Sequence, residues 1–214
     1  MEIYQTEEQQ VEAIKGYWAK NGNTIIAGIA LGFASFIGYN LYQDNQLEQE
    51  LAVSDSYQAL IEQSGKDAKA FTENGEKFIN ENGNNSYVAL TALALAKEAA
   101  SHKDWPAVQK QLNTAISSAP TEGIKAIASL RLARVQVQLE QYTEALATLN
   151  SNLPEAFTAA VEEIKGDAYI QQGKKDLARN AYQAAIAADG IATSPNLQIK
   201  LDDLAQVTTL PVTK

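Results

Sequence analysis

An uncharged stretch, TIIAGIALGFASFIGYNLY at residues 24–42, most constrains what this chain can fold into. No Asp, Glu, Lys or Arg lies between Lys20 and Asp44. About 20 apolar residues are enough for a helix to cross the hydrocarbon core of a bilayer. Aromatic residues, which prefer the headgroup level, lie at both ends. We therefore predict a tail at 1–23, a membrane-spanning helix at 24–42, and a larger region at 43–214.

Two alternatives to a membrane anchor are a buried core helix and a cleaved signal peptide. A helix at the edge of a core has polar residues along one face, but Ser35 is the only polar side chain between Thr24 and Tyr39. A signal peptide has a shorter apolar region after a basic stretch and a small-residue cleavage site behind it. Here the apolar stretch is preceded by an acidic tail, and the residues after it, QDNQLEQE, contain no such cleavage site. The pattern favours an uncleaved anchor, with the signal peptide as the weaker alternative.

The distribution of basic residues predicts the orientation of this span. Lys15 and Lys20 lie just before it, whereas the first basic residue after it is Lys66. Lys and Arg near a membrane helix are retained on the cytoplasmic side, while acidic residues have little influence. We expect the N-terminus in the cytoplasm and the region from about Gln43 onward on the other side, which is type II topology.

The composition limits the classes of partner and of chemistry that the exported region can have. The 214 residues have a formal net charge of −9 and include no Cys. An acidic surface does not suit nucleic acid, whose phosphates need basic neutralisation. The absence of Cys excludes disulfides, thiol catalysis and thiolate metal sites. The mean hydropathy of −0.25 fits one span followed by a soluble body.

Three segments of that body share one helical pattern: LALAKEAASHKDWPAVQKQLNTAI, LRLARVQVQLEQYTEALATL and IKGDAYIQQGKKDLARNAYQAAI. In each, a small residue is followed by a second apolar position and then by a larger residue one turn further on. These positions are Ala96, Val108 and Leu112, then Ala133, Ala145 and Leu149, then Gly166, Ala178 and Tyr182. The arrangement and its period of roughly 34 residues are typical of tetratricopeptide (TPR) repeats. We therefore predict an all-α fold.

The two ends of the repeat region match the pattern less well. Residues 45–82 are expected to form a further helix pair. Residues 193–207 are expected to form a capping helix, with Ser194 and Pro195 as its N-cap and first turn. Its apolar residues should face the preceding helix and its acidic pair should face solvent. These residues are Leu197, Ile199, Leu201 and Leu204, and Asp202 and Asp203.

In TPR arrays the first helices of the pairs line a concave groove, which is the usual partner site. The residue after each small crossing position, and those about one turn beyond, should face this groove. They are Lys97, Arg134, Val137, Gln138, Asp167, Ile170 and Gln171. The alternative is that they form solvated surface or contacts between repeats. In the span, Gly28 and Gly32 form a G-x-x-x-G motif for helix packing, unless they reflect only the frequency of Gly in membrane helices.

Catalytic patterns are weak. His102 is the single histidine and has only Asp104 close by, so a solvated turn is the simplest interpretation. Asp202 and Asp203 suit a solvated face better than an acid/base pair. There is no P-loop and no G-x-G-x-x-G motif. We expect no enzyme activity, no cofactor, no metal and no small-molecule substrate.

Several stretches together resemble the YfgM family over essentially the whole chain. They are the opening MEIY, then QVEAIKGYWAKNG, the Gly-rich span, and LRLARVQVQLEQYTEAL. That family comprises ancillary TPR-like subunits of the bacterial SecYEG translocon. The resemblance implies an inner-membrane protein with its helical domain in the periplasm. It further implies association with the translocon and with the membrane-anchored periplasmic chaperone PpiD.

The predicted function is a non-enzymatic, membrane-tethered interaction module beside the translocon that assists exported client chains or chaperones. Within the same class, the alternative is a TPR scaffold for another cell-envelope complex. An exported hydrolase is a hypothesis of a different class, and a dense cluster of titratable residues in a deep pocket would favour it.

Overall fold

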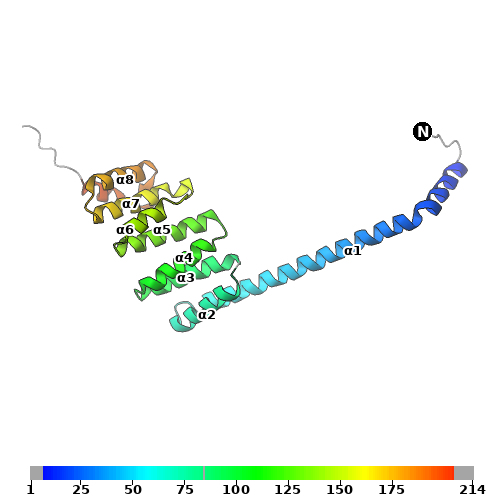
Figure 1. The fold of residues 1–214 in the computed structure, drawn as a ribbon, viewed down its shortest axis with the longest axis horizontal. Helices are drawn as coiled ribbons and strands as arrows, with labels where there is room; N and C mark the ends of the chain where they lie inside the picture. Colours follow the sequence, from blue (N-terminus) through cyan, green and yellow to red (C-terminus); the bar gives the residue numbers. More distant parts are fainter. Residues whose placement is uncertain (1–6, 84, 205–214) are drawn as a thin grey trace, which may run out of the picture. The chain divides into compact units, whose positions relative to one another are not determined.

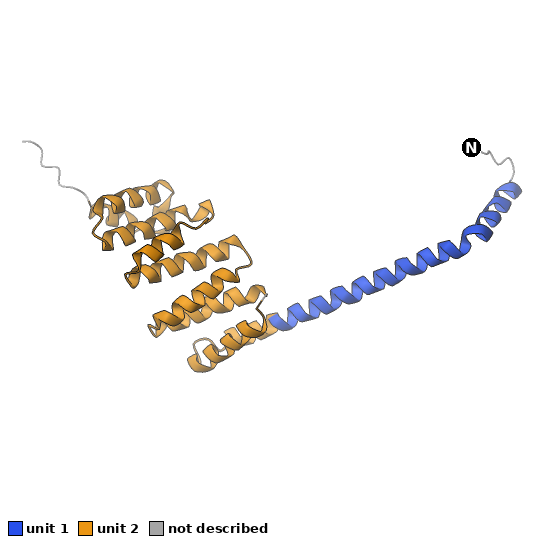
Figure 2. Ribbon diagram, in the orientation of Figure 1, with its two compact units in different colours: residues 1–53 blue, residues 54–214 orange. Residues whose placement is uncertain are grey.

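The computed structural model describes residues 7–83 and 85–204, and within these residues every regular element is a helix. The prediction of an all-α fold is therefore confirmed. The chain divides into two compact units, residues 1–53 and residues 54–214 (Figure 2). The division falls inside the first helix, α1 (Glu7–Ile61).

Unit 1 contains the uncharged stretch, as part of α1. Its large apolar side chains point outward on all faces, each more than half exposed: Ile26, Ile29, Leu31, Phe33, Phe36, Ile37 and Leu41. A helix that is apolar all round needs an apolar surrounding, and this unit provides no core for it. Among the described residues α1 is the helix long and apolar enough to cross a membrane. It is thus a candidate transmembrane helix, and its exposure does not fit the core-helix alternative.

Unit 2 is a stack of helix pairs, which Figure 1 shows running from cyan to red. After α2 (Ala68–Glu81) come the pairs α3 (Ser86–Ser101) with α4 (Trp105–Ser117), α5 (Glu122–Gln138) with α6 (Tyr142–Leu149), and α7 (Thr158–Gln171) with α8 (Lys175–Ala187). A 3₁₀ turn, η1 (Glu155–Phe157), precedes α7, and the short helices α9 (Gly190–Thr193) and α10 (Leu197–Asp202) follow α8. These pairs contain the three predicted repeats.

Side-chain caps explain where several of these helices begin. Asp67, Asn85, Asp104 and Thr121 precede α2, α3, α4 and α5, and the side chain of each accepts a hydrogen bond from a backbone N–H of the first turn. Such caps satisfy donors that have no partner within the helix.

The turns inside the three pairs also repeat. Lys103, Glu140 and Gly173 occupy equivalent places and have φ values of 59°, 60° and 72°. The residue after each donates a backbone hydrogen bond into the preceding helix, to the carbonyl of Ala99, Gln136 or Tyr169. Only the third repeat uses Gly, the residue for which this left-handed conformation carries no Cβ penalty.

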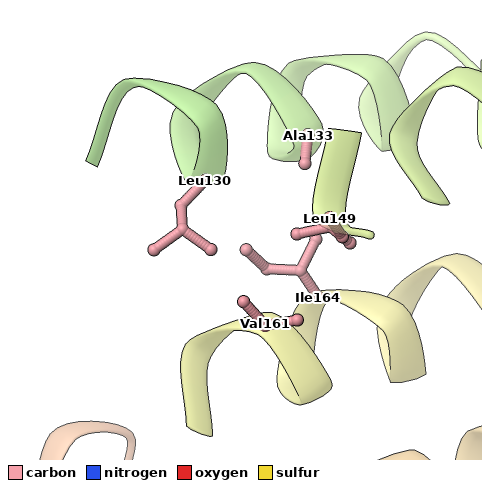
Figure 3. Packing of buried hydrophobic residues seen from close by; sticks show 5 residues of the cluster. All are labelled: Leu130, Ala133, Leu149, Val161 and Ile164. Atoms are coloured by element: carbon pink, nitrogen blue, oxygen red, sulfur yellow. The ribbon is translucent and has the colours of Figure 1, made fainter. Parts of the chain in front are cut away.

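The small residues of the pattern lie where paired helices cross. Ala133 is fully buried in the cluster of Figure 3, with Leu130, Leu149, Val161 and Ile164. In the third pair the fit is tighter, because a Cβ on Gly166 would lie 2.3 Å from Cε1 of Tyr182. The alternation of small and large residues is therefore a packing requirement.

Residues 45–82 form a helix pair in part. The end of α1 and α2 both lie there, and within unit 2 the Tyr57 ring contacts Phe78 at 6.3 Å between centroids and stacks on Tyr87 at 4.8 Å. The hydroxyls of Ser54 and Tyr87 are 3.0 Å apart and hydrogen-bonded.

The predicted capping helix at 193–207 is wrong in its extent. Thr193 ends α9, Ser194 does not cap the final helix, and α10 begins only at Leu197, after Asn196. Leu197 and Leu204 are buried and Leu201 is half-buried against α8, but Ile199 is 59% exposed. Residue 199 lies two positions from both 197 and 201, so at about 100° per residue it points to the opposite face. Asp202 and Asp203 are exposed, and the predicted end at Val207 lies outside the described residues.

Candidate partner-binding groove

Two hollows lie along the first helices of the repeats. The first, which we call the α5–α7 hollow, has a volume of about 480 Å³. It is lined by Arg134, Val137, Gln138, Glu140, Tyr142, Ile164, Asp167, Ile170, Gln171 and Lys200. Six of the seven residues predicted for the groove are among them. The register of the repeat therefore places these side chains together, whereas their role in binding stays a prediction.

The second hollow, which we call the α3–α5 pocket, has a volume of about 290 Å³. It is lined by Leu93, Ala96, Lys97, Ala100, Val108, Leu112, Arg131, Arg134 and Val135. Its floor is formed by Ala96, Val108 and Leu112, which are buried members of one core cluster. Lys97, the seventh predicted groove residue, lies here. Arg134 lines both hollows, so they lie next to each other along α5.

A polar cluster borders the α5–α7 hollow, and its members Asp167 and Lys200 line that hollow. Lys200 Nζ donates hydrogen bonds to Asp167 Oδ1 at 2.8 Å, Asp167 Oδ2 at 2.9 Å and Glu163 Oε1 at 2.8 Å. The Tyr182 hydroxyl donates to Asp167 Oδ1 at 2.7 Å, and the Ser194 hydroxyl donates to Glu163 Oε1 at 2.8 Å. These contacts join α7 and α8 to the C-terminal α10. Asp167 was predicted only as groove surface from its place in the repeat, but it also accepts hydrogen bonds that hold neighbouring helices together.

Burial, hydrogen bonds and neighbouring charges shift the pKa values of Glu163, Lys200 and Tyr182. Burial alone would raise the pKa of Glu163, but the hydrogen bonds from Lys200 and Ser194 outweigh it and hold that pKa below its ordinary value. Burial would lower the pKa of Lys200, yet Asp167 and Glu163 raise it. Burial and the bond to Asp167 raise the pKa of Tyr182 well above its ordinary value. The pKa values of Glu163, Lys200 and Tyr182 are all shifted away from neutral pH, so these three groups suit structure and recognition better than acid/base chemistry.

Sequence reasoning did not find Lys200, Arg131, Glu140 or Tyr142. Arg131 could have been predicted, because it precedes Arg134 by three residues and therefore lies on the same face of α5. Lys200 could not, because its partners lie 33 and 37 positions away and only the packing of α10 brings them close.

The other residues considered for chemistry lie apart from the groove. His102 is exposed, and its Nε2 is 3.2 Å from Glu98 Oε1 on the same face of α3. Asp104, its neighbour in sequence, caps α4 by accepting from Ala107 N. No group of three or more His, Cys, Asp or Glu side chains within the described residues could hold a metal ion.

In unit 1, a Cβ built on Gly28 or on Gly32 would meet no atom within 4 Å. This face of α1 is therefore open to a neighbouring helix. Helix packing through the G-x-x-x-G motif stays a prediction.

Comparison of the sequence with known protein families supports this architecture. Residues 15–206 match the family model described as a tetratricopeptide repeat-like domain. The chain is 34% identical over 206 residues to the "Ancillary SecYEG translocon subunit" of Escherichia coli, covering 96% of this chain and 100% of that protein. It is 33% identical to the protein of that name from Haemophilus influenzae, over 92% and 97%, and 32% identical to that from Aggregatibacter actinomycetemcomitans, over 92% and 97%.

No solved structure matches the chain. The family model spans most of the chain, and the three relatives are more than 30% identical over 97–100% of their own lengths, so both comparisons lead to one assignment. The resemblance to YfgM noted in the sequence is confirmed: this chain belongs to the family of ancillary SecYEG translocon subunits with a tetratricopeptide repeat-like domain.

Proposed function

We propose that this protein is a non-enzymatic, membrane-tethered interaction module of the SecYEG translocon. In this proposal α1 holds it in the inner membrane with its N-terminus in the cytoplasm, and the repeat unit lies in the periplasm. There it binds a chaperone of the PpiD type or an exported client chain. The names of its relatives, the candidate membrane span and the basic residues Lys15 and Lys20 support this proposal.

The observation that carries the binding role is that the two hollows lie next to each other along α5. Together they offer an apolar pocket, mixed charges and exposed amides within one strip, and Arg134 is common to both parts. An extended polypeptide needs such a strip, because its side chains alternate every 3.3 Å or so and must find successive pockets.

The tether is part of the mechanism. A domain held at one membrane site meets partners there at an effective concentration of about millimolar, without any additional contact. Weak binding in the groove is then sufficient, and clients can be released. The open faces of Gly28 and Gly32 offer α1 a close contact with a partner's membrane helix, which would set the location.

Site-specific crosslinking in cells tests the proposal. A photoreactive amino acid at Gln138 or Gln171, both exposed in the α5–α7 hollow, should yield crosslinks to translocon subunits, to a PpiD-type chaperone or to a chain in export. The matched control is Gln183, which is also exposed, lies on α8 and lines neither hollow. Crosslinks from all three positions alike, or only to other envelope complexes, would contradict the proposal. The second of these results would support the scaffold alternative.

A further inference from the structure

The α3–α5 pocket differs from the rest of the surface in its charge. The whole chain has 26 acidic residues against 17 Lys and Arg. The pocket nevertheless carries Lys97, Arg131 and Arg134 on its rim and no acidic residue in its lining. The α5–α7 hollow, by contrast, contains both Glu140 and Asp167. A local positive potential on an acidic protein selects partners that bear the opposite charge at that place.

Two of these cations have no partner of their own. Within residues 7–83 and 85–204 the side chains of Lys97 and Arg131 make no hydrogen bond and no salt bridge. Arg134 interacts at longer range with Glu163, since its charge contributes to lowering the pKa of that carboxyl. The ammonium and guanidinium donors of Lys97 and Arg131 are therefore free to bind an incoming carboxylate. For Arg this can be a two-bond, planar contact.

The floor beneath these cations is apolar. Ala96, Val108 and Leu112 are each at most 4% exposed, and Leu93, Ala100 and Val135 form half-buried walls. A volume of about 290 Å³ lies near the lower limit for sites that enclose a small ligand. This volume has room for one or two bulky apolar side chains.

We propose that the α3–α5 pocket takes an extended segment of a partner polypeptide in which a bulky apolar residue is flanked by acidic residues. The apolar side chain enters between α3 and α5, and the neighbouring carboxylates pair with Lys97, Arg131 and Arg134. This inference rests on the proposed function, because it names the chemistry that the groove would recognise. A nucleic acid fits poorly, because the net charge of −9 repels an extended polyanion.

Fluorescence anisotropy on the full-length protein in zwitterionic lipid nanodiscs tests this preference. The probes are four short peptides on one template with Leu and Phe at alternate positions. In three of them the flanking residues are Glu, Gln or Lys; in the fourth, Glu is kept and Ser replaces Leu and Phe. The Glu peptide with Leu and Phe should bind about tenfold or more tighter than the Lys peptide, with the Gln peptide between them. Its affinity should fall as salt screens the charges.

A charge reversal separates recognition from folding. Lys97→Glu combined with Arg131→Glu should reverse the order, so that the Lys peptide binds best. The matched control is Lys66→Glu combined with Lys175→Glu, which makes the same change in net charge at exposed positions outside both hollows. The control should keep the order of the wild type. Because the reversed variant should gain affinity for the Lys peptide, misfolding cannot produce the expected result.

Several results would overturn the inference. They are equal binding of the Glu, Gln and Lys peptides, unchanged preference after the reversal, equal binding of the Ser peptide, or no peptide binding. Displacement of the Glu peptide by phosphatidylglycerol vesicles, but not by phosphatidylcholine vesicles, would assign the pocket to an anionic lipid headgroup. The crosslinks from Gln138 and Gln171 do not depend on these peptides. They can therefore succeed where the acidic preference fails, and the two proposals fall separately.

Discussion

Lys200 Nζ lies 2.8 Å from Asp167 Oδ1 and 2.8 Å from Glu163 Oε1, so one cation on the final helix binds two carboxylates on α7. Glu163 is the more buried of the two acids, with 14% of its side chain exposed, while Asp167 and Lys200 are about one-third exposed. The contact ties α10 to α7 of the third repeat. It also borders the α5–α7 hollow, so stability and the shape of the groove are linked there.

Removing this cation should destabilise unit 2. In Lys200→Met the two carboxylates lose their shared donor and repel each other at a half-buried site. We expect a loss of about 1.5–3 kcal/mol, the usual range for hydrogen bonds to charged groups. The control is Lys174→Met, at an exposed turn position whose ammonium donates only to Gln172. Thermal unfolding followed by circular dichroism should show a lower Tm for the first variant alone; equal Tm values would mean that the cluster contributes nothing.

The stability of the same cluster should depend on pH at both extremes. The pKa of Glu163 is lowered by folding from 4.5, so its contribution is present above that value and is lost as the pH falls through the folded-state pKa. The pKa of Lys200 is raised from 10.5, so its contribution is present below 10.5 and is lost as the pH rises through the folded-state pKa. The pKa of Tyr182 is raised from 10.0, so its contribution to stability is likewise present below pH 10.0 and is lost as the pH rises through the folded-state pKa.

Melting curves across pH would check this dependence. The Tm of Glu163→Gln should vary less with pH below about 4.5 than the Tm of the wild type, because the titrating carboxyl is gone. Glu162→Gln is the matched control, since Glu162 pairs only with Lys165 on the same helix. If the two variants lost stability identically in acid, the assignment to Glu163 would be wrong.

A methyl group at the tightest helix crossing should be costly. Gly166→Ala places a Cβ 2.3 Å from the Tyr182 ring, and overpacking of this kind usually costs about 1–3 kcal/mol. Gly123→Ala is the control, because the nearest atom to its Cβ is 3.9 Å away and Ala favours a helix. The second repeat suggests a rescue, since it pairs Ala133 with Leu149. Tyr182→Leu should therefore restore part of the Tm of Gly166→Ala, and full additivity of the two losses would contradict the crossing geometry.

A charge in the middle of the span should impair insertion. Gly32→Asp adds about 3 kcal/mol to the cost of placing the helix in the bilayer, which removes most of a modest favourable sum. Gly32→Leu should insert normally but disturb any close contact through the G-x-x-x-G face. Carbonate extraction of membranes measures insertion, and crosslinking between membrane helices measures the contact. Normal membrane retention of Gly32→Asp would refute the span, and unchanged crosslinks of Gly32→Leu would refute the contact.

The proposed orientation predicts the behaviour of reporter fusions. A reporter that is active only outside the cytoplasm should work after Lys214 and fail before Met1, because Lys15 and Lys20 hold the tail inside. Protease added to spheroplasts should digest the repeat unit and spare the tail. Reversal of both results would show that two lysines do not decide the topology. Lys15→Gln with Lys20→Gln should weaken the preference for one orientation.

Patterns that repeat within one helix or one helix pair were sufficient to predict much of this protein. An uncharged run long enough to span a bilayer is a local property, and so is the spacing from Ala133 to Leu149 or from Gly166 to Tyr182. Each TPR unit packs mainly on its neighbours. The shared register of the second and third repeats was therefore sufficient to predict that Arg134 and Gln171 lie in a common hollow.

The tertiary structure decided what depends on residues far apart in the chain. The sequence placed Ile199 on the packed face and Asp167 in a simple groove surface. In the folded protein Ile199 instead points outward, and Lys200 lies against Asp167 and Glu163. It also brings Arg131 to the rim of an apolar pocket with Lys97 from another helix. Such contacts follow from how α10 docks and how α3 and α5 stack. These arrangements come from the packing of many side chains at once, so no short stretch of sequence encodes them.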